Sequence, residues 1–263
     1  MEVEALHVIR EKTSLPVPKV SAWGLARENQ LCLGPFKLLN FKNGICLGEV
    51  FGGGSSRLIR EDIRDTDIEF VYRQMAHFMF QFYSIDFSQI GSLPTLKTKF
   101  PAPGHPLTWK AHEILRVGGV DTWFVVIEPM VSLRPETIIL ESLIPELTHP
   151  TYDRGPFKLI CDDFGLGNVI VRSKDDLTIT GVVDMEWVYA GPAQLFGSAP
   201  WWLLMDRPLN EEWDFEEDDA PEATDRYLKC LEIFIRVLSD EEGKMTGNGR
   251  KELTELVKRS KDS

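Results

Sequence analysis

Positive charge and cysteine are both scarce in this chain of 263 residues. Lys and Arg together number 29 against 41 Asp and Glu, which gives a formal net charge of −12 at pH 7. A chain this acidic repels phosphate backbones, and no stretch of it forms a compensating basic groove, so we expect no nucleic-acid partner. The cysteines form no CxxC pair, which is typical of reduced thiols in a cytoplasmic protein rather than of a disulfide frame or a zinc site. They are Cys32, Cys46, Cys161 and Cys230.

Long apolar runs and histidine metal motifs are also missing. The uncharged apolar stretches fall well short of the ~18 residues of a membrane span. The N-terminal run MEVEALHVIREK mixes charges of both signs instead of offering an apolar signal segment. The five histidines show neither HxxxH nor HExxH spacing. Hydrophobic residues make up 43% of the chain, enough for a packed core, so we expect a folded protein with no membrane partner.

Hydrophobic periodicity outlines the secondary structure. Apolar residues at helical spacing predict helices over residues 2–12, 60–86 and 224–238, and a short one over 200–205. Extended segments are expected at 17–23 and 31–41, and regular pairing in the second should begin after Pro35, which cannot donate to a ladder. The run 123–131 is compatible with either helix or strand.

The stretch between residues 157 and 184 carries the candidate chemistry. It predicts three short strands, over 157–160, 168–171 and 178–183, with a polar turn between the last two. In a regular hairpin centred on residue 176, Asn168 and Asp184 face each other at the open end, ~5 Å apart at Cα. Their oxygens form a hard-ligand pair that suits Mg²⁺. Asp163, on the preceding loop, adds a third oxygen group at the same end, which a core would not hold without partners.

Structural roles, and not catalytic ones, are expected for the residues near this trio. Asp162 is expected to be a solvated loop acid or a turn cap. Cys161, at the end of a strand, is expected to be a small buried thiol. Trp201 and Trp202 are expected to pack in the core rather than to form a stacking platform.

The spacing Asp163-x4-Asn168, followed by strand, turn, strand and Asp184, resembles the catalytic loop and metal-binding Asp of protein-kinase-like phosphotransferases. The more similar group is that of the aminoglycoside phosphotransferases and choline kinases. There the metal-binding Asp is followed by an aromatic residue and a carboxylate, and here the run is DMEW. Similar segments extend over roughly two thirds of the chain. Residues 2–20 resemble the family's helix and the segment after it, 33–47 the strand that enters the hinge, and 106–120 and 191–204 stretches of fungal-type members.

This resemblance implies an α+β, protein kinase-like fold. A remnant small lobe with the hinge would cover residues 1–48, and a mainly helical large lobe that binds the acceptor would cover residues 49–263. The resemblance carries no information on the oligomeric state.

The resemblance also assigns roles to four residues. Asp163 would orient and deprotonate the acceptor hydroxyl, while Asn168 and Asp184 would bind ATP through the Mg²⁺ that bridges its phosphates. Glu2 occupies the helix position whose carboxylate pairs, in the family, with a phosphate-holding lysine. The implied function is ATP- and Mg²⁺-dependent phosphorylation of a hydroxyl on a small molecule, and the acidic composition would suit a cationic acceptor.

Two departures from the family leave alternatives open. The family's lysine and glycine-rich loop precede the helix, whereas only Met1 precedes Glu2 here, so a truncated member is expected. Cys161 stands where the family has its catalytic-loop histidine. The alternative functions are a non-catalytic, pseudokinase-type binding or regulatory protein, and a truncated gene product without activity.

Overall fold

The structure is a computed structural model of the chain. It describes residues 2–29, 31, 34–53, 56–93, 152, 154–205, 220–247 and 249–259. Cys32, the run 123–131 and the segment 106–120 lie outside the described residues. Mixed helices and antiparallel sheets confirm the α+β class.

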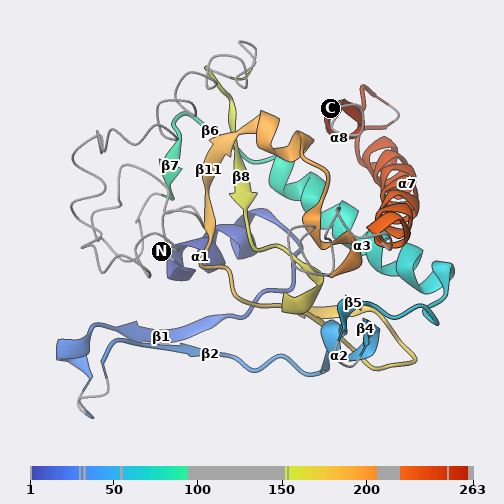
Figure 1. Ribbon diagram of the computed structural model, residues 1–263. Helices are drawn as coiled ribbons and strands as arrows, with labels where there is room; N and C mark the ends of the chain where they lie inside the picture. The colour runs from blue at the N-terminus through green and yellow to red at the C-terminus, as the bar shows by residue number, and fades with distance from the viewer. Residues whose placement is uncertain are drawn as a thin grey trace, which may run out of the picture.

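The N-terminal part consists of one helix and one hairpin. Helix α1 (Glu2–Lys12) confirms the first predicted helix and buries its apolar stripe. Strands β1 (Val20–Gly24) and β2 (Phe36–Leu39) pair antiparallel, with Trp23 opposite Lys37. Pairing begins beyond the proline, as predicted. This hairpin runs along the lower edge of the molecule in Figure 1.

Helices α3 (Asp65–Tyr83) and α7 (Ala220–Met245) pack against each other and form the helical side of the molecule (Figure 1). The helix predicted over 60–86 is shorter at both ends, because residues 61 and 62 form a turn and Asp86 enters a strand. Helix α7 instead extends the predicted helix in both directions. Helix α8 (Glu252–Arg259) follows it.

The core between these helices is aromatic. The Tyr72 ring of α3 meets the rings of Trp202 and Phe234 edge-on, with centroids 5.8 and 6.0 Å apart. Trp202 is 4% exposed, which confirms the prediction that it packs in the core, whereas Trp201 is only partly buried. The predicted helix over 200–205 is a 3-10 turn, η4 (Trp201–Leu204).

A four-stranded antiparallel sheet supports the other side of α3. Its order is β6 (Asp86–Phe87), β8 (Phe157–Cys161), β11 (Val188–Pro192) and β7 (Gly91–Ser92). The first four residues of β8 are buried. The strand therefore delivers the loop that follows it from the interior of the protein.

A second sheet, in the order β10 (Ile179–Val182), β9 (Val169–Val171) and β3 (Ile45–Cys46), corrects the predicted hairpin. Val182 lies opposite Val169, and the Val183 N–H donates to the Asn168 carbonyl at 3.0 Å. Asn168 therefore faces Val183 and not Asp184. The ladder is out of the predicted register because the hairpin is centred on residue 175, with Ile179 opposite Val171, and not on residue 176. The irregularity between Ile179 and Gly181 offsets only part of this difference.

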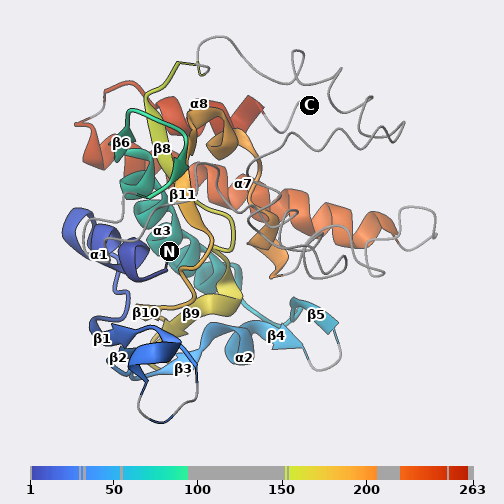
Figure 2. The same ribbon diagram turned by 90° about the vertical axis from the view of Figure 1, so that its left-hand side faces the viewer.

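Short elements complete the described chain. They are η1 (Ala26–Glu28), α2 (Leu47–Phe51), β4 (Gly52–Gly53), β5 (Ser56–Ile59), η2 (Leu166–Asn168) and η3 (Ala193–Gly197). Figure 2 shows β9 and β10 between the hairpin below them and β8 and β11 above. None of the helices in the described ranges is long and apolar enough to cross a membrane.

Candidate functional site

Two of the predicted site residues contact each other directly. The Asn168 side-chain amide donates to the Asp163 carboxylate at 2.9 Å and to the Asp163 backbone oxygen at 3.0 Å. The 3-10 turn η2 makes this contact possible, because it brings the end of the 161–168 loop back to the loop's start. The sequence predicted that Asn168 opens the strand. In the structure, Asn168 ends the turn η2, and β9 begins one residue later at Val169.

Asp184 lies two residues beyond the end of β10. Its φ angle is 63°, in the left-handed region, which Asp tolerates better than most residues. The residue is exposed, and its carboxylate has no hydrogen-bond or ion-pair partner among the described residues. A non-glycine residue held in this conformation with an unpaired charge is a candidate for binding a ligand.

The Cys161 thiol shows that the acids gather at one place. Burial raises its pKa above the usual range, and the negative charges of Asp163, Asp162 and Asp184 act in the same direction. All three carboxylates therefore lie within electrostatic reach of one buried sulfur at the end of β8. The raised pKa keeps the thiol neutral. The residue is partly exposed and not buried as expected, and its Sγ lies 4.0 Å from the Met185 sulfur.

The oxygen donors at this place fit Mg²⁺. Asn168 uses its nitrogen to bind Asp163, so its amide oxygen is left without a protein partner among the described residues. That oxygen and the Asp184 carboxylate are hard ligands, and Mg²⁺ typically takes one or two protein oxygens and completes its shell with water and phosphate. No group of three His, Cys, Asp or Glu suited to a metal occurs in the described ranges. Asn168 and Asp184 are therefore the residues that could hold such an ion.

Glu2 has a lysine partner that the sequence analysis missed. It forms an ion pair with Lys37 of β2. The Glu2 side chain is 11% exposed and that of Lys37 45% exposed, so the carboxylate is held inside while the ammonium stays accessible. The available signal was the single charge within the apolar strand FKLL.

The prediction for Asp162 is wrong. Its carboxylate accepts a hydrogen bond from the Tyr189 hydroxyl at 3.0 Å, and its backbone oxygen accepts one from Trp201 Nε1 at 3.3 Å. On β11, Val188 pairs with Cys161, the residue before Asp162. This pairing brings Tyr189, next to Val188, close to Asp162, which is half-buried. Burial also raises the pKa of Tyr189, which keeps its hydroxyl a donor.

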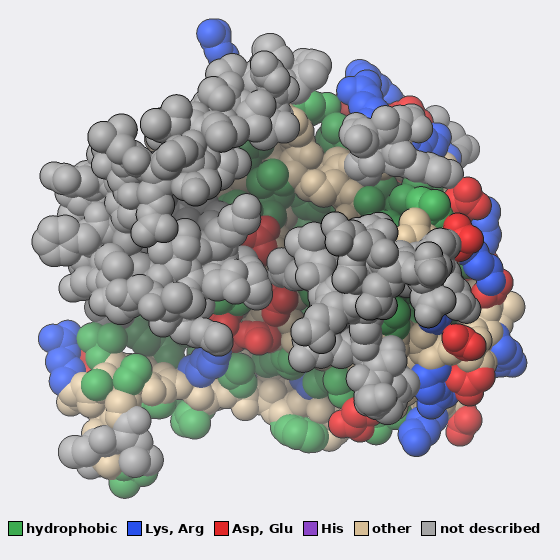
Figure 3. Space-filling model, in the orientation of Figure 1, with side chains coloured by type: hydrophobic (Ala, Val, Ile, Leu, Met, Phe, Trp, Pro, Cys, Tyr) green, Lys and Arg blue, Asp and Glu red, His purple; other side chains and the backbone are tan. Residues whose placement is uncertain are grey.

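Acidic side chains gather near the centre of the face shown in Figure 3, above the β1–β2 hairpin. Beside the 161–168 loop lies a cavity of about 230 Å³, lined by residues of α3, the end of β8 and the segment 195–202. The loop that carries Asp163 therefore borders this open cavity through Cys161, Asp162 and Phe164.

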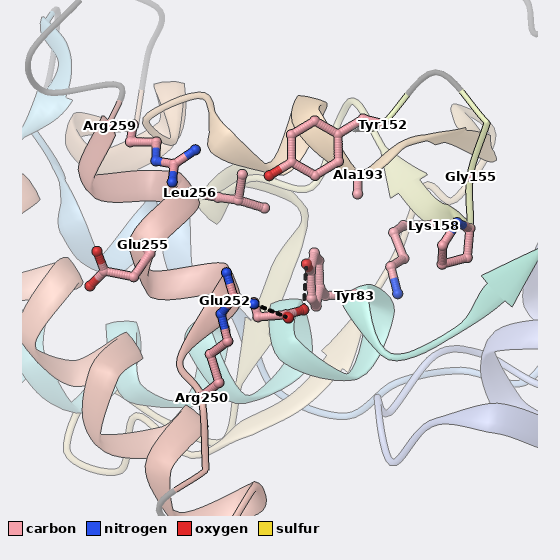
Figure 4. A pocket seen from close by; sticks show the side chains of 11 residues that line it. Tyr83, Tyr152, Gly155, Lys158, Ala193, Arg250, Glu252, Glu255, Leu256 and Arg259 are labelled. Carbon is pink, nitrogen blue, oxygen red and sulfur yellow. Dashed lines mark hydrogen bonds and ion pairs between the residues drawn. The ribbon is translucent and has the colours of Figure 1, made fainter. Parts of the chain in front are cut away.

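Another cavity, of about 240 Å³, lies at the opposite end of β8 (Figure 4). Lys158 in its wall pairs with Asp86 at 2.5 Å and lies over the Tyr83 ring, 4.6 Å from the centroid. The Tyr83 hydroxyl in turn donates to Glu252 at 3.5 Å. These charges are already compensated, and the cavity is remote from the 161–168 loop.

No protein-family model and no curated protein matches the chain. Solved structures do match it, and all of those described here are aminoglycoside phosphotransferases, the group that the sequence resembles. A ternary complex of a thermostable mutant of APH(4)-Ia with ADP and hygromycin B is 18% identical, with a TM-score of 0.43 over 100% of this chain and 83% of that one. The aminoglycoside-3'-phosphotransferase of type VIII is 17% identical, with a TM-score of 0.45 over 99% and 78%. A putative aminoglycoside phosphotransferase from Ralstonia eutropha is 14% identical, with a TM-score of 0.44 over 99% and 79%.

Proposed function

We propose that this chain is a phosphotransferase that uses ATP and Mg²⁺ to phosphorylate a hydroxyl of a small molecule. The observation that carries the proposal is the pairing of Asn168 with Asp163. It leaves the Asn168 amide oxygen and the Asp184 carboxylate, which has no partner in the described part of the chain, as ligands for a shared ion. Residues 1–48 would form the nucleotide side of the site and residues 49–263 the acceptor side.

Asp163 has the role of the base in this proposal. The acceptor hydroxyl gives its proton to the Asp163 carboxylate while its oxygen bonds to the γ-phosphorus of ATP. The bond between that phosphorus and the bridging oxygen breaks, and ADP leaves. Such a transfer depends mainly on placement and on charge compensation. The hydrogen bond from Asn168 fixes the orientation of the Asp163 carboxylate before the acceptor binds.

The remaining residues hold the nucleotide. Mg²⁺ bound by Asn168 and Asp184 would neutralise charge on the phosphate oxygens. Lys37 would add a fixed positive charge for the phosphates, since its ammonium is accessible and Glu2 holds it in place. Lys37 thereby takes the role that the resemblance gives to an upstream lysine.

The test is a coupled assay of ADP release with purified protein, Mg·ATP and a panel of amino-alcohols, phenols and aminoglycosides. Turnover that depends on the acceptor and is lost in Asp163→Asn supports the proposal. Turnover that Asp163→Asn leaves unchanged contradicts the assigned roles.

A non-catalytic binding protein is the second candidate, and Cys161 favours it. The sulfur lies at the position where the resembling catalytic loop carries a histidine, and it lies 4.0 Å from the Met185 sulfur. A thiol is a weak hydrogen-bonding group, so it would hold the loop less firmly than an imidazole. Saturable binding of Mg·ATP without phosphoryl transfer to any acceptor would support this second function.

A further inference from the structure

The residue just before the proposed base makes three hydrogen bonds. The Tyr189 hydroxyl donates to the Asp162 carboxylate at 3.0 Å, and Trp201 Nε1 donates to the Asp162 backbone oxygen at 3.3 Å. The Asp162 backbone N–H donates to the backbone oxygen of Trp187 at 3.2 Å. The backbone donor, the backbone acceptor and the side chain of this residue are therefore all bonded, and Asp163 follows it directly in the chain.

All three partners of Asp162 lie outside the 161–168 loop. Tyr189 lies on β11 and is 5% exposed, and Trp187 comes just before this strand. Strand β11 pairs with β8 along its full length, so both partners belong to the four-stranded sheet. Trp201 opens the 3-10 turn η4. The loop is thus attached to regular elements, which hold a side chain more precisely than other loops do.

Trp201 contacts the loop at a second point. A Cβ added to Gly165 would lie 2.7 Å from the Trp201 indole, so the ring lies directly against the backbone there. Phe164 is 5% exposed, and its ring meets the Phe82 ring edge-on with centroids 5.3 Å apart. The residues on both sides of the proposed base are therefore fixed, Asp162 by hydrogen bonds and Phe164 by packing.

The other polar contacts of the loop attach it less firmly. The Cys161 thiol is a weak hydrogen-bonding group, and its sulfur lies 4.0 Å from the Met185 sulfur. Asn168 orients the Asp163 carboxylate, but it belongs to the same loop, so this contact closes the loop on itself. The bond from a phenol to the Asp162 carboxylate is charge-assisted and hence stronger than a neutral hydrogen bond.

We propose that Asp162 is a positioning residue, whose carboxylate, held by the Tyr189 hydroxyl, fixes the backbone from which Asp163 projects. The proposal rests on the proposed function in that Asp163 is the base. The attachment of the loop can be measured without any reaction, so the two are tested separately. Asp162 itself contacts neither nucleotide nor acceptor in this role.

Tyr189→Phe tests the attachment, because it removes the hydroxyl and keeps the buried ring. Amide hydrogen exchange of residues 161–168, followed by mass spectrometry, should become about 10-fold faster or more, the usual effect of losing a hydrogen bond to a charged group. Exchange in α3 should keep the parent rate, which distinguishes a loosened loop from global unfolding. The matched control is Tyr83→Phe, which removes a hydroxyl bonded to Glu252 at 3.5 Å, and it should leave the loop unchanged.

Two variants of Asp162 separate the hydrogen bond from the charge. Asp162→Ala should loosen the loop as Tyr189→Phe does, whereas Asp162→Asn should restore most of the lost protection, because its amide oxygen still accepts from Tyr189. In the ADP-release assay, Tyr189→Phe should lower kcat about 10- to 100-fold, the cost of a misplaced reacting group, with the KM of Mg·ATP unchanged. Asp162→Asn should recover most of the kcat that Asp162→Ala loses.

Loop exchange that neither Tyr189→Phe nor Asp162→Ala accelerates would overturn the proposal, as would an Asp162→Asn variant whose loop exchanges as fast as that of Asp162→Ala. Faster exchange with an unchanged kcat would also overturn the positioning role, while the transferase would stand. Faster exchange in a protein that transfers phosphate to nothing would keep Asp162 as the residue that fixes Asp163 and would refute the proposed function.

Discussion

The Asn168 side chain donates hydrogen bonds to both the carboxylate and the backbone oxygen of Asp163, at 2.9 and 3.0 Å. These two bonds use both protons of the amide nitrogen. They fix the Asp163 carboxylate relative to the start of β9 and free the Asn168 amide oxygen for another ligand. One side chain thus links the proposed base to the proposed metal site.

Replacing Asp163 with Asn should remove the base and keep the loop. The new amide oxygen can still accept the hydrogen bond from Asn168, so Mg·ATP should bind as it does to the parent. We expect kcat to fall by about 10²–10⁴-fold, the usual contribution of a general base. Steady-state ADP release together with a Mg·ATP thermal shift checks both parts, and a loss of nucleotide binding would show that Asp163 has a different role.

Lys37→Met should weaken nucleotide binding without unfolding the protein, because Lys37 is 45% exposed. A hydrogen bond to a charged group contributes about 1.5–3 kcal/mol, so we expect the Kd of Mg·ATP to rise about 10- to 100-fold. The matched control is Lys19→Met, at an exposed lysine just before β1. Isothermal titration calorimetry measures the Kd of Mg·ATP for both variants. Equal Kd values would show that Lys37 does not bind the nucleotide.

A buried carboxylate joins the last two helices. Glu242, 1% exposed near the end of α7, accepts hydrogen bonds from the Leu253 and Thr254 backbone N–H groups, both at 2.9 Å, and from the Thr254 hydroxyl at 2.6 Å. It therefore satisfies donors at the start of α8.

Glu242→Gln would place an amide nitrogen against one of these donors. We expect the free energy of unfolding to fall by about 1–3 kcal/mol, measured by urea denaturation with unchanged m-value. A Glu252→Gln variant, whose side chain is 52% exposed, serves as the control and should change stability far less. Equal effects in the two variants would contradict the capping role.

An ion-pair cluster between α3 and α7 makes stability depend on pH. Hydrogen bonds from Arg236 and Arg73 lower the pKa of Glu69 from 4.5 to about 2. Because the folded-state pKa lies below the unfolded one, the stabilisation is fully present above pH 4.5 and is lost as the pH falls toward 2.

Glu69→Gln should therefore be less stable than the parent at pH 7, and the difference should shrink as the pH falls below 4.5. Urea denaturation at pH 7, 5 and 3.5 measures this trend. Glu61→Gln, at an exposed turn, should show no such trend. A difference for Glu69→Gln that does not depend on pH would rule out the ionised pair as its cause.

Helix and strand periodicity predicted most of the described scaffold. The 3.6-residue spacing of apolar residues predicted α1, α3 and α7, because each of these helices buries one face in a shared core. The loop-strand-turn-strand unit was predictable because its hydrophobic runs are bounded by polar turns. The predicted order of these segments therefore holds, while the roles of Asp163, Asn168 and Asp184 stay a prediction.

The local irregularities were not predictable. The hairpin turns one residue earlier than predicted and its pairing is irregular between Ile179 and Gly181, and neither feature leaves a clear trace in an alternating pattern. The pairing of Lys37 with Glu2 and of Asp162 with Tyr189 joins residues far apart in the sequence. Both depend on how sheets and helices pack together, which periodicity within one segment does not report.

The most direct test of a metal site shared by Asn168 and Asp184 is a thermal-shift titration with ATP in the presence and absence of Mg²⁺. At 100 times its Kd, a ligand that binds only the folded state stabilises it by about 2.7 kcal/mol, which corresponds to several degrees in Tm for a chain of this size. The account predicts a Mg²⁺-dependent shift that Asp184→Asn removes, with Asp175→Asn on the exposed turn of the same hairpin as the control that keeps it. No shift at millimolar Mg·ATP, or a shift of equal size in Asp184→Asn, would contradict it.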